Sequence, residues 1–285
     1  MAVYDINGNA ISSVYEISGS ELAQVYDIDQ NPLLDVGDTL TVMTYNVQRC
    51  RGINSQQTMQ NAIFNAYNAD IIGLQELGSE ISLPSVLSAL DEYAVKQFSN
   101  HNNKVLMVKK TGTLSNVVIA DFTNQDQLDM STWNETRAYM KAEITVGDKT
   151  ITWINTHLCY MTQSVKWLQM NEIFELAEQC DYCIITGDFN SHTVNATSDD
   201  YLNMYKQFVD AGYNLANNSP SSGFTNTCTE ATTASALSDL TDALDTIIVS
   251  SNITINRVTF DTTKFSYLNG QSIDHIPVVA RLVVH

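Results

Sequence analysis

The chain has 285 residues, 44% of them apolar, and 32 acidic against 14 basic side chains give it a net charge of −18. No apolar run approaches the roughly 18–20 residues that cross a bilayer, so we expect a globular protein. The charge argues against broad electrostatic capture of a polyanion and is compatible with use of divalent cations. Because a basic start followed by an apolar segment is absent, we expect no standard signal peptide and a cytoplasmic location by default.

An eleven-residue repeat occupies the start of the chain. Residues 3–9, 14–20 and 25–31 each begin with Val, Tyr, an acidic residue and Ile, and continue into turn-forming residues. Each unit predicts a short strand and a turn. Since so small a unit buries little surface alone, we expect residues 1–35 to serve attachment or self-association, and residues 36–285 to form the main domain.

The main domain opens with two predicted strands that end in polar residues. Residues 39–47 alternate and are rich in β-formers, which predicts a strand that delivers Asn46 to a sheet edge. Ser55 can cap a helix to about Tyr67, and a second apolar strand, residues 69–74, leads to Glu76. A carboxylate directly after an apolar strand is costly to bury without a partner, which favours a metal or ion-pair role for Glu76.

The middle of the chain is less regular. The pattern predicts a helix near residues 83–90 and strands near 93–98, 104–108, 117–121, 137–144 and 150–158. Arg137 enters one of these strands, and its planar guanidinium suits phosphate oxygens, with a surface ion pair as the alternative. The strand at 150–158 closes on His157, and a helix of period 3.6 is expected from about residue 164 to 178.

Polar residues also follow the strands in the last third. The apolar residues after Cys183 predict a buried strand that ends at Gly187, Asp188 and Asn190, although turns favour these residue types for conformational reasons alone. Two further strands are predicted at 243–250 and 278–284. Their margins carry the remaining candidates, which are Asp245, Asp274 and His275. Polar residues at so many strand margins indicate a site built across a sheet edge.

The cysteines give little functional signal. Their number is odd in a large chain, so we expect reduced thiols rather than a disulfide framework. Cys180 and Cys183 form a CxxC pair, but a second pair that would complete a zinc site is missing, and the pair leads into a strand instead of opening a helix. We therefore expect no functional role for it.

Seven segments in order resemble the endonuclease/exonuclease/phosphatase superfamily, the DNase I-like fold. They are MTYNV, LQE, the strand entered through Arg137, NTHL, TGDFN, LDTIIVS and SIDHIPV, and they span residues 39–285. Each is weak alone, but their order makes the signal strong. The resemblance implies an α/β fold, a four-layer α/β sandwich of two facing mixed β-sheets with helices outside. It also implies Mg²⁺-dependent phosphoester hydrolysis, with Mn²⁺ or Ca²⁺ as alternative ions.

The resemblance also implies a role for each matched residue. Magnesium prefers carboxylate and amide oxygens, so Glu76 is the expected metal ligand, with Asn46 and Asp274 beside it or acting through water. Asp188 would orient or deprotonate the attacking water. The other expected roles are phosphate contacts and proton transfer, and they fall to Arg137, His157, Asn190, Asp245 and His275. Asp245 would pair with His275 and favour its protonated form, which leaves open whether this His is acid or base.

Departures from the family pattern bear on the substrate. Residues 102–106 lack the Glu that supports the first His in DNase I-like nucleases, and Ile273 replaces the usual Ser before Asp-His. The inositol-phosphatase signatures and the Tyr of abasic-site endonucleases are absent too. No apolar hairpin suggests membrane insertion. We therefore predict a DNase-type endonuclease acting on nucleic acid. A lipid or small-molecule phosphodiesterase or phosphatase, and a non-catalytic structural or binding protein, are the alternatives.

Overall fold

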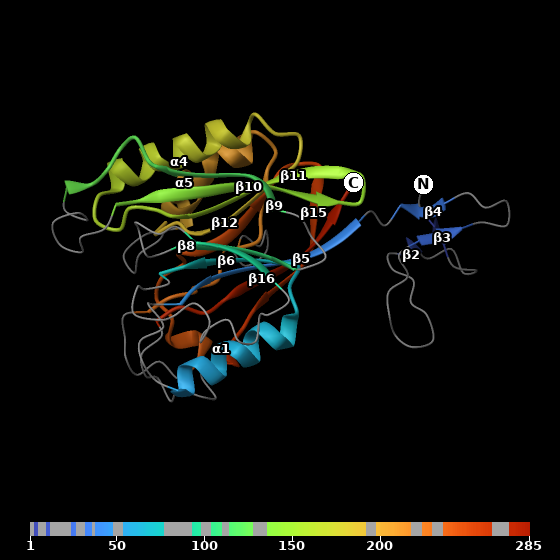
Figure 1. The fold of residues 1–285 in the computed structure, drawn as a ribbon, viewed down its shortest axis with the longest axis horizontal. Coiled ribbons are helices and arrows are strands. Elements are labelled where there is room, and N and C mark those ends of the chain that lie inside the picture. Colours follow the sequence, from blue (N-terminus) through green and yellow to red (C-terminus); the bar gives the residue numbers. More distant parts are fainter. Residues whose placement is uncertain are drawn as a thin grey trace.

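The computed structural model describes residues 3–4, 10–11, 24–26, 32–35, 38–47, 54–76, 93–97, 104–109, 114–127, 136–191, 198–217, 224–229, 236–263 and 274–285. From residue 38 onward they form two six-stranded sheets that pack face to face, with helices on the outer faces (Figure 1). This arrangement confirms the predicted four-layer α/β sandwich. Among the described segments, no helix combines the length and the apolar character that crossing a membrane requires.

The first sheet has the strand order β15-β16-β5-β6-β8-β7. Its strands are β5 (Asp38–Asn46), β6 (Ile71–Gln75), β7 (Tyr93–Gln97), β8 (Lys104–Lys109), β15 (Ile253–Phe260) and β16 (Val278–Val284). Only β5 and β6 pair in parallel, and α1 (Asn54–Tyr67) connects them. A parallel pair needs such a crossover, and α1 lies on the outer face of this sheet (Figure 1).

The second sheet repeats this plan with the order β13-β14-β12-β11-β10-β9. Its strands are β9 (Leu114–Asp121), β10 (Ala138–Val146), β11 (Lys149–His157), β12 (Cys183–Asp188), β13 (Asn214–Leu215) and β14 (Asp245–Val249). Here β11 and β12 are the parallel pair, joined through α4 (Gln163–Ala177). Helix α5 (Ser198–Asp210) lies beside α4 on the outer face (Figure 1).

The central strands of the second sheet are buried on both faces, which explains their continuous apolar runs. Successive side chains alternate between two cores. One core lies between the sheets and includes Trp153, Ile184 and Ile247. The other lies under the outer helices and includes the next residue of each strand, Ile154, Ile185 and Ile248. A slip of one residue would move every side chain into the other core and disrupt the packing of both, which fixes the positions of the last residues of these strands.

Buried polar side chains cross between the sheets just below these strand ends. Asn155 Oδ1 accepts hydrogen bonds from Gln75 Nε2 at 2.7 Å and from Thr186 Oγ1 at 3.0 Å. Asn155 Nδ2 donates to the Leu74 carbonyl at 3.0 Å. Gly73 makes this close approach possible, because a Cβ atom there would lie 2.3 Å from Thr186 Oγ1.

Replacing Gly73 with alanine should therefore destabilise the protein. The added methyl group has no room beside this polar network, and overpacking of this kind costs about 1–3 kcal/mol. Urea unfolding should show a lower midpoint with an unchanged slope. Ser164→Ala on the exposed surface of α4 is the control and should stay within about 0.5 kcal/mol of the parent. Equal stability of both variants would show that the two sheets can move apart at Gly73 without lowering the free energy of unfolding.

Most predicted elements from residue 39 onward are confirmed within one to three residues at each end. The helix predicted near residues 83–90 lies outside the described residues. Sequence analysis did not identify α5, β13 or β15, nor the short 3₁₀ helix Leu237–Asp239. Among the described residues, the cysteines at positions 159, 180, 183 and 228 form no disulfide with one another.

The repeat region contains two antiparallel strand pairs. β1 (Val3–Tyr4) pairs with β2 (Ala10–Ile11), and β3 (Gln24–Tyr26) pairs with β4 (Pro32–Asp35). The first and third repeats thus contribute strands, while residues 14–20 lie outside the described part of the chain. A role of residues 1–35 in attachment or self-association stays a prediction.

Candidate active site

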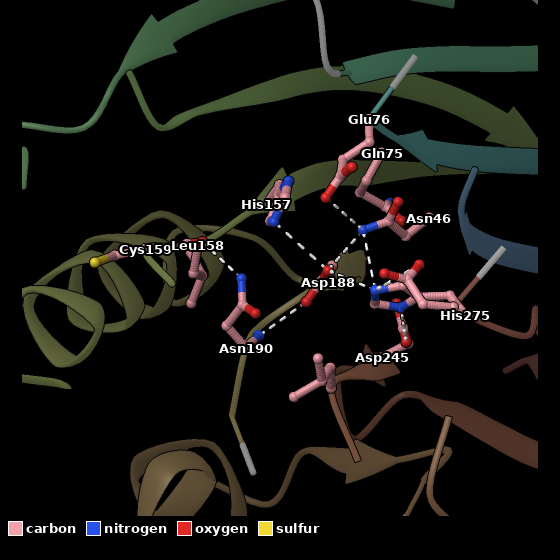
Figure 2. A network of polar contacts seen from close by, with 12 residues as sticks. Asn46, Gln75, Glu76, His157, Leu158, Cys159, Asp188, Asn190, Asp245 and His275 are labelled. Carbon is pink, nitrogen blue, oxygen red and sulfur yellow. Dashed lines mark hydrogen bonds and ion pairs between the residues drawn. The ribbon is translucent and has the colours of Figure 1, made fainter. Parts of the chain in front are cut away.

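The strand registers bring the predicted site residues to one end of the sandwich. In the second sheet, His157 of β11 is the register partner of Asp188 on β12, which in turn is the partner of Asp245 on β14. In the first sheet, Asn46 ends β5 beside β6, and Glu76 follows β6 directly. Figure 2 shows that side chains from both sheets converge on Asp188.

Asp188 is the centre of this network and is almost fully buried. Its Oδ2 accepts a hydrogen bond from Asn46 Nδ2 at 2.8 Å. The same oxygen lies 3.5 Å from His157 Nε2 and 3.6 Å from His275 Nε2. Its Oδ1 accepts a hydrogen bond from the Asn190 backbone N–H at 3.0 Å. Groups at the ends of β5 and β11, His275 just before β16, and the turn after β12 thus all approach this one carboxylate.

The turn after β12 fixes Asn190 in a rarely used conformation. Its φ is +49°, in the left-handed region that Asn tolerates better than most residues. Its Nδ2 donates to the Leu158 carbonyl at 3.0 Å, and its own carbonyl accepts a hydrogen bond from Lys166 Nζ of α4. Lys166 is buried, so its hydrogen bond fixes this turn against α4. The Asn190 N–H therefore points at Asp188 because both flanking contacts are fixed.

Burial raises the pKa of Asp188 to about 7, and the nearby charge of Asp245 adds to this effect. His275 and the hydrogen bonds from Asn46 and Asn190 act in the opposite direction. A carboxyl group with a pKa near neutrality can accept a proton from water at physiological pH and release it again. Asp188 thus has the protonation behaviour of a general base.

His275 is oriented by Asp245 on its other side. Its Nδ1 donates to Asp245 Oδ2 at 2.8 Å, and Thr227 Oγ1 donates to the same oxygen at 2.7 Å. Burial lowers the pKa of His275, but the negative charge of Asp245, together with that of Asp274 and Asp188, outweighs burial and raises this pKa well above its usual value. These charges favour the protonated form of His275, and its Nε2 faces the centre of the site, 3.3 Å from Asn46 Nδ2.

Glu76 and Asn46 form the side of the site that suits a hard cation. Asn46 Nδ2 donates to Glu76 Oε1 at 3.1 Å, and Glu76 has a φ of +54°. Glu76, His157 and Asp188 each offer a ligand atom, and the three atoms lie within 4.8 Å of one another. Carboxylate and amide oxygens are the ligands that Mg²⁺ prefers. Glu76, His157 and Asp188 could therefore hold a divalent metal ion, and the identity of that ion stays a prediction.

Asp274 and Arg137, two further predicted site residues, lie at the same end of the sandwich. Asp274 is partly exposed, and its Oδ1 lies 3.9 Å from His275 Nε2. Arg137 immediately precedes β10 and is buried, with its backbone N–H donating to Gln125 Oε1 at 2.8 Å. Because β10 pairs with β11 in antiparallel register, Arg137 lies at the strand end that carries His157. Its contact with a substrate phosphate stays a prediction.

Sequence analysis missed several residues that support the site. Gln75 and Thr186 lie below it, Lys166 holds the Asn190 turn, and Thr227 bonds Asp245. Gln75 and Thr186 stood inside the quoted motifs LQE and TGDFN. The others follow no apolar strand end, and a Lys on an amphipathic helix or a Thr in a loop is usually a surface residue. Their roles depend on contacts far apart in the sequence.

The raised pKa of Asp188 predicts how its replacement changes stability with pH. The folded protein binds a proton at Asp188 up to about pH 7, whereas the unfolded chain releases it near 3.8. Stability of the metal-free protein should therefore fall as pH rises through this window. Asp188→Asn has no carboxyl group to ionise at this position. The free energy of unfolding of the variant relative to the parent should therefore rise from about pH 4 to 7, by on the order of 4 kcal/mol.

Urea unfolding in chelator at several pH values measures this difference. The control is Asp210→Asn, because Asp210 is exposed and paired with Lys206 on α5. Its difference from the parent should be nearly independent of pH. A flat difference for Asp188→Asn would mean that the carboxyl group is charged throughout the window.

Solved structures share the fold and this arrangement of strands. An endonuclease/exonuclease/phosphatase from Bacteroides vulgatus has 16% identity and a TM-score of 0.68, covering 87% of this chain and 99% of that chain. TDP2 from D. rerio, complexed with a single-strand DNA product, has 15% identity and a TM-score of 0.65, and the match covers 86% of this chain and 98% of that chain. A functionally unknown conserved protein from Enterococcus faecalis V583 has 14% identity and a TM-score of 0.62, covering 86% and 100%.

The sequence itself identifies the family. No curated protein matches the chain. The family model described as the Endonuclease/Exonuclease/phosphatase family matches residues 43–262, and the chain belongs to this family. Membership places it among hydrolases of the phosphoesterase and nuclease type, which typically depend on a divalent metal ion. The resemblance found in the motifs is thereby confirmed.

Proposed function

We propose that this protein is a Mg²⁺-dependent phosphodiester hydrolase whose substrate is nucleic acid. The observation that carries the proposal is the position of Asp188. Its carboxylate lies within 3.6 Å of two imidazole nitrogens, is fixed by Asn46 and Asn190, and has a pKa near neutrality. A purely structural carboxylate would gain nothing from a pKa at which it is half protonated.

Each polar group then has a role in cleavage of a phosphodiester. Asp188 accepts a proton from the attacking water and orients that water toward the phosphorus atom. His275, held protonated by Asp245, and His157 donate hydrogen bonds to phosphate oxygens, where negative charge accumulates in the transition state. Glu76, Asn46 and Asp274 would hold the metal ion, which neutralises phosphate charge when bound.

The proposed substrate is nucleic acid. The site is built for an anionic diester, and the structurally similar TDP2 is complexed with single-strand DNA. The net charge of −18 leaves few cations to contact a polyanion. Binding should thus depend weakly on monovalent salt, with a slope that corresponds to only about 2–4 phosphate contacts. Arg137 would be one of these contacts.

The reaction class is tested with bis(4-nitrophenyl) phosphate. We expect Mg²⁺-dependent release of nitrophenol that chelator abolishes and added Mg²⁺ restores, in the parent and in the control Asp210→Asn. The substrate is tested with a panel of single- and double-stranded DNA, RNA, a phospholipid and small phosphoesters. Cleavage of the small ester with no cleavage of nucleic acid would overturn the nucleic-acid substrate and favour a lipid or metabolite. No Mg²⁺-dependent turnover of any member would support a non-catalytic binding protein.

A further inference from the structure

Cys228 is a thiol beside the proposed catalytic site that the proposed reaction does not use. Residues 227–229 pair with 274–276 as a short antiparallel bridge in which Cys228 is the partner of His275. The Thr229 N–H donates to the Asp274 carbonyl at 3.0 Å, and the Ile276 N–H donates to the Thr227 carbonyl at 2.8 Å. These bonds flank the Cys228 and His275 pair, which makes it a non-hydrogen-bonded pair, where side chains lie closest.

The backbone therefore holds a thiol next to the imidazole. Cys228, Asp274 and His275 each offer one ligand atom, and the three atoms lie within 4.8 Å of one another. A tetrahedral zinc ion with ligands at about 2.0–2.3 Å separates its ligand atoms by roughly 3.3–3.7 Å, so side-chain shifts of about 1 Å would complete the site. Such shifts need no change in the backbone pairing.

The donor set discriminates between metals. A thiolate is a poor ligand for Mg²⁺, which takes oxygen, whereas Zn²⁺ and Co²⁺ accept sulfur, nitrogen and oxygen together. Asp245 Oδ2 holds His275 Nδ1 at 2.8 Å, so Nε2 is the ring nitrogen that would bind a metal, in exchange for its contact with Asn46 Nδ2 at 3.3 Å. A carboxylate behind a histidine is the usual support of a zinc ligand. Cys228, Asp274 and His275 thus differ in kind from the oxygen-rich group around Glu76.

We propose that Cys228, Asp274 and His275 form an inhibitory site for zinc and similar borderline metals, which shares Asp274 with the proposed Mg²⁺ position but adds a sulfur and a nitrogen ligand. Metal binding displaces the thiol proton of Cys228 and the Nε2 proton of His275, both of which pass to solvent, and forms bonds to Cys228 Sγ, His275 Nε2 and an Asp274 oxygen. Water fills the fourth position. A metal ion bound there prevents His275 and Asp274 from taking part in the reaction, so it inhibits the activity proposed above. The inhibition rests on the proposed function, whereas metal binding itself does not.

Binding is tested on the full chain with Co²⁺ alone, without substrate. A thiolate bound to Co²⁺ gives a near-ultraviolet charge-transfer band, and tetrahedral Co²⁺ gives visible bands. We expect both in the parent and in the control Cys180→Ser, whose thiol lies in the CxxC pair before β12. In Cys228→Ser and Cys228→Ala the charge-transfer band should be lost, with circular dichroism reporting that both variants fold. The same band in parent and variants would overturn the site.

Inhibition is tested separately with Zn²⁺ at saturating Mg²⁺ and bis(4-nitrophenyl) phosphate. Cys228→Ser should keep the parent turnover without zinc and should need at least about tenfold more Zn²⁺ for half inhibition. Equal inhibition of parent and variant would overturn the brake even if Co²⁺ binds. If the parent shows no turnover, the proposed function fails, while the cobalt spectrum still decides whether the metal site exists.

Discussion

Asp188→Asn is expected to lower kcat by roughly 10²–10⁴-fold, the scale typical of acid–base and electrostatic groups. Asparagine has the same shape, so the hydrogen bond that the Asn190 N–H donates to Oδ1 can persist. It cannot accept a proton from water, and it removes the charge opposite His157 and His275. Because burial of the charged carboxylate is itself unfavourable, the variant should fold at least as well as the parent.

The measurement is steady-state kinetics on bis(4-nitrophenyl) phosphate, with His275→Ala as a second variant. His275→Ala should fall in the same range because it removes a donor to the phosphate oxygens. Asp210→Asn, in an exposed ion pair on α5, should match the parent. A loss confined to KM in Asp188→Asn would show that this residue binds substrate without taking part in the reaction.

The fold could be predicted from sequence because the signals are local and strong. Central strands such as Cys183–Asp188 are buried on both faces and read as continuous apolar runs, and α4 carries a helical period between two such strands. β15 was missed although it alternates, because residues 251–271 contain no quoted motif. Its exposed face and edge position give it a weaker apolar pattern than the central strands.

Only the site residues that lie at or next to strand ends could be predicted from the sequence. Asn46, His157 and Asp188 each end a strand. Strand register places His157 beside Asp188, and the face-to-face packing of the two sheets brings Asn46 to Asp188. The contacts that tune them come from elsewhere. Thr227 reaches Asp245 from a loop, and Lys166 reaches the Asn190 carbonyl from the buried side of α4. Neither contact has a local sequence pattern, because each depends on how elements pack.

Glu76→Gln should separate metal binding from folding. Glutamine keeps an oxygen that can accept the hydrogen bond from Asn46 Nδ2, now 3.1 Å from Glu76 Oε1, so the strand end should keep its structure. It loses the negative charge that a divalent cation requires. We expect weaker Mn²⁺ binding by calorimetry and, at limiting Mg²⁺, turnover reduced by roughly 10²–10³-fold, with part of the loss recovered at high Mg²⁺.

The control is Glu143→Gln, because Glu143 lies on β10 and bonds the exposed Asn116, away from the strand ends. Its metal affinity and turnover should equal those of the parent. The urea midpoint of Glu76→Gln should change little, because Glu76 is only partly buried. Near-normal turnover of Glu76→Gln at limiting Mg²⁺ would mean that the metal is held elsewhere, and the oxygens of Asp188 and Asp274 would become the candidates for its main ligands.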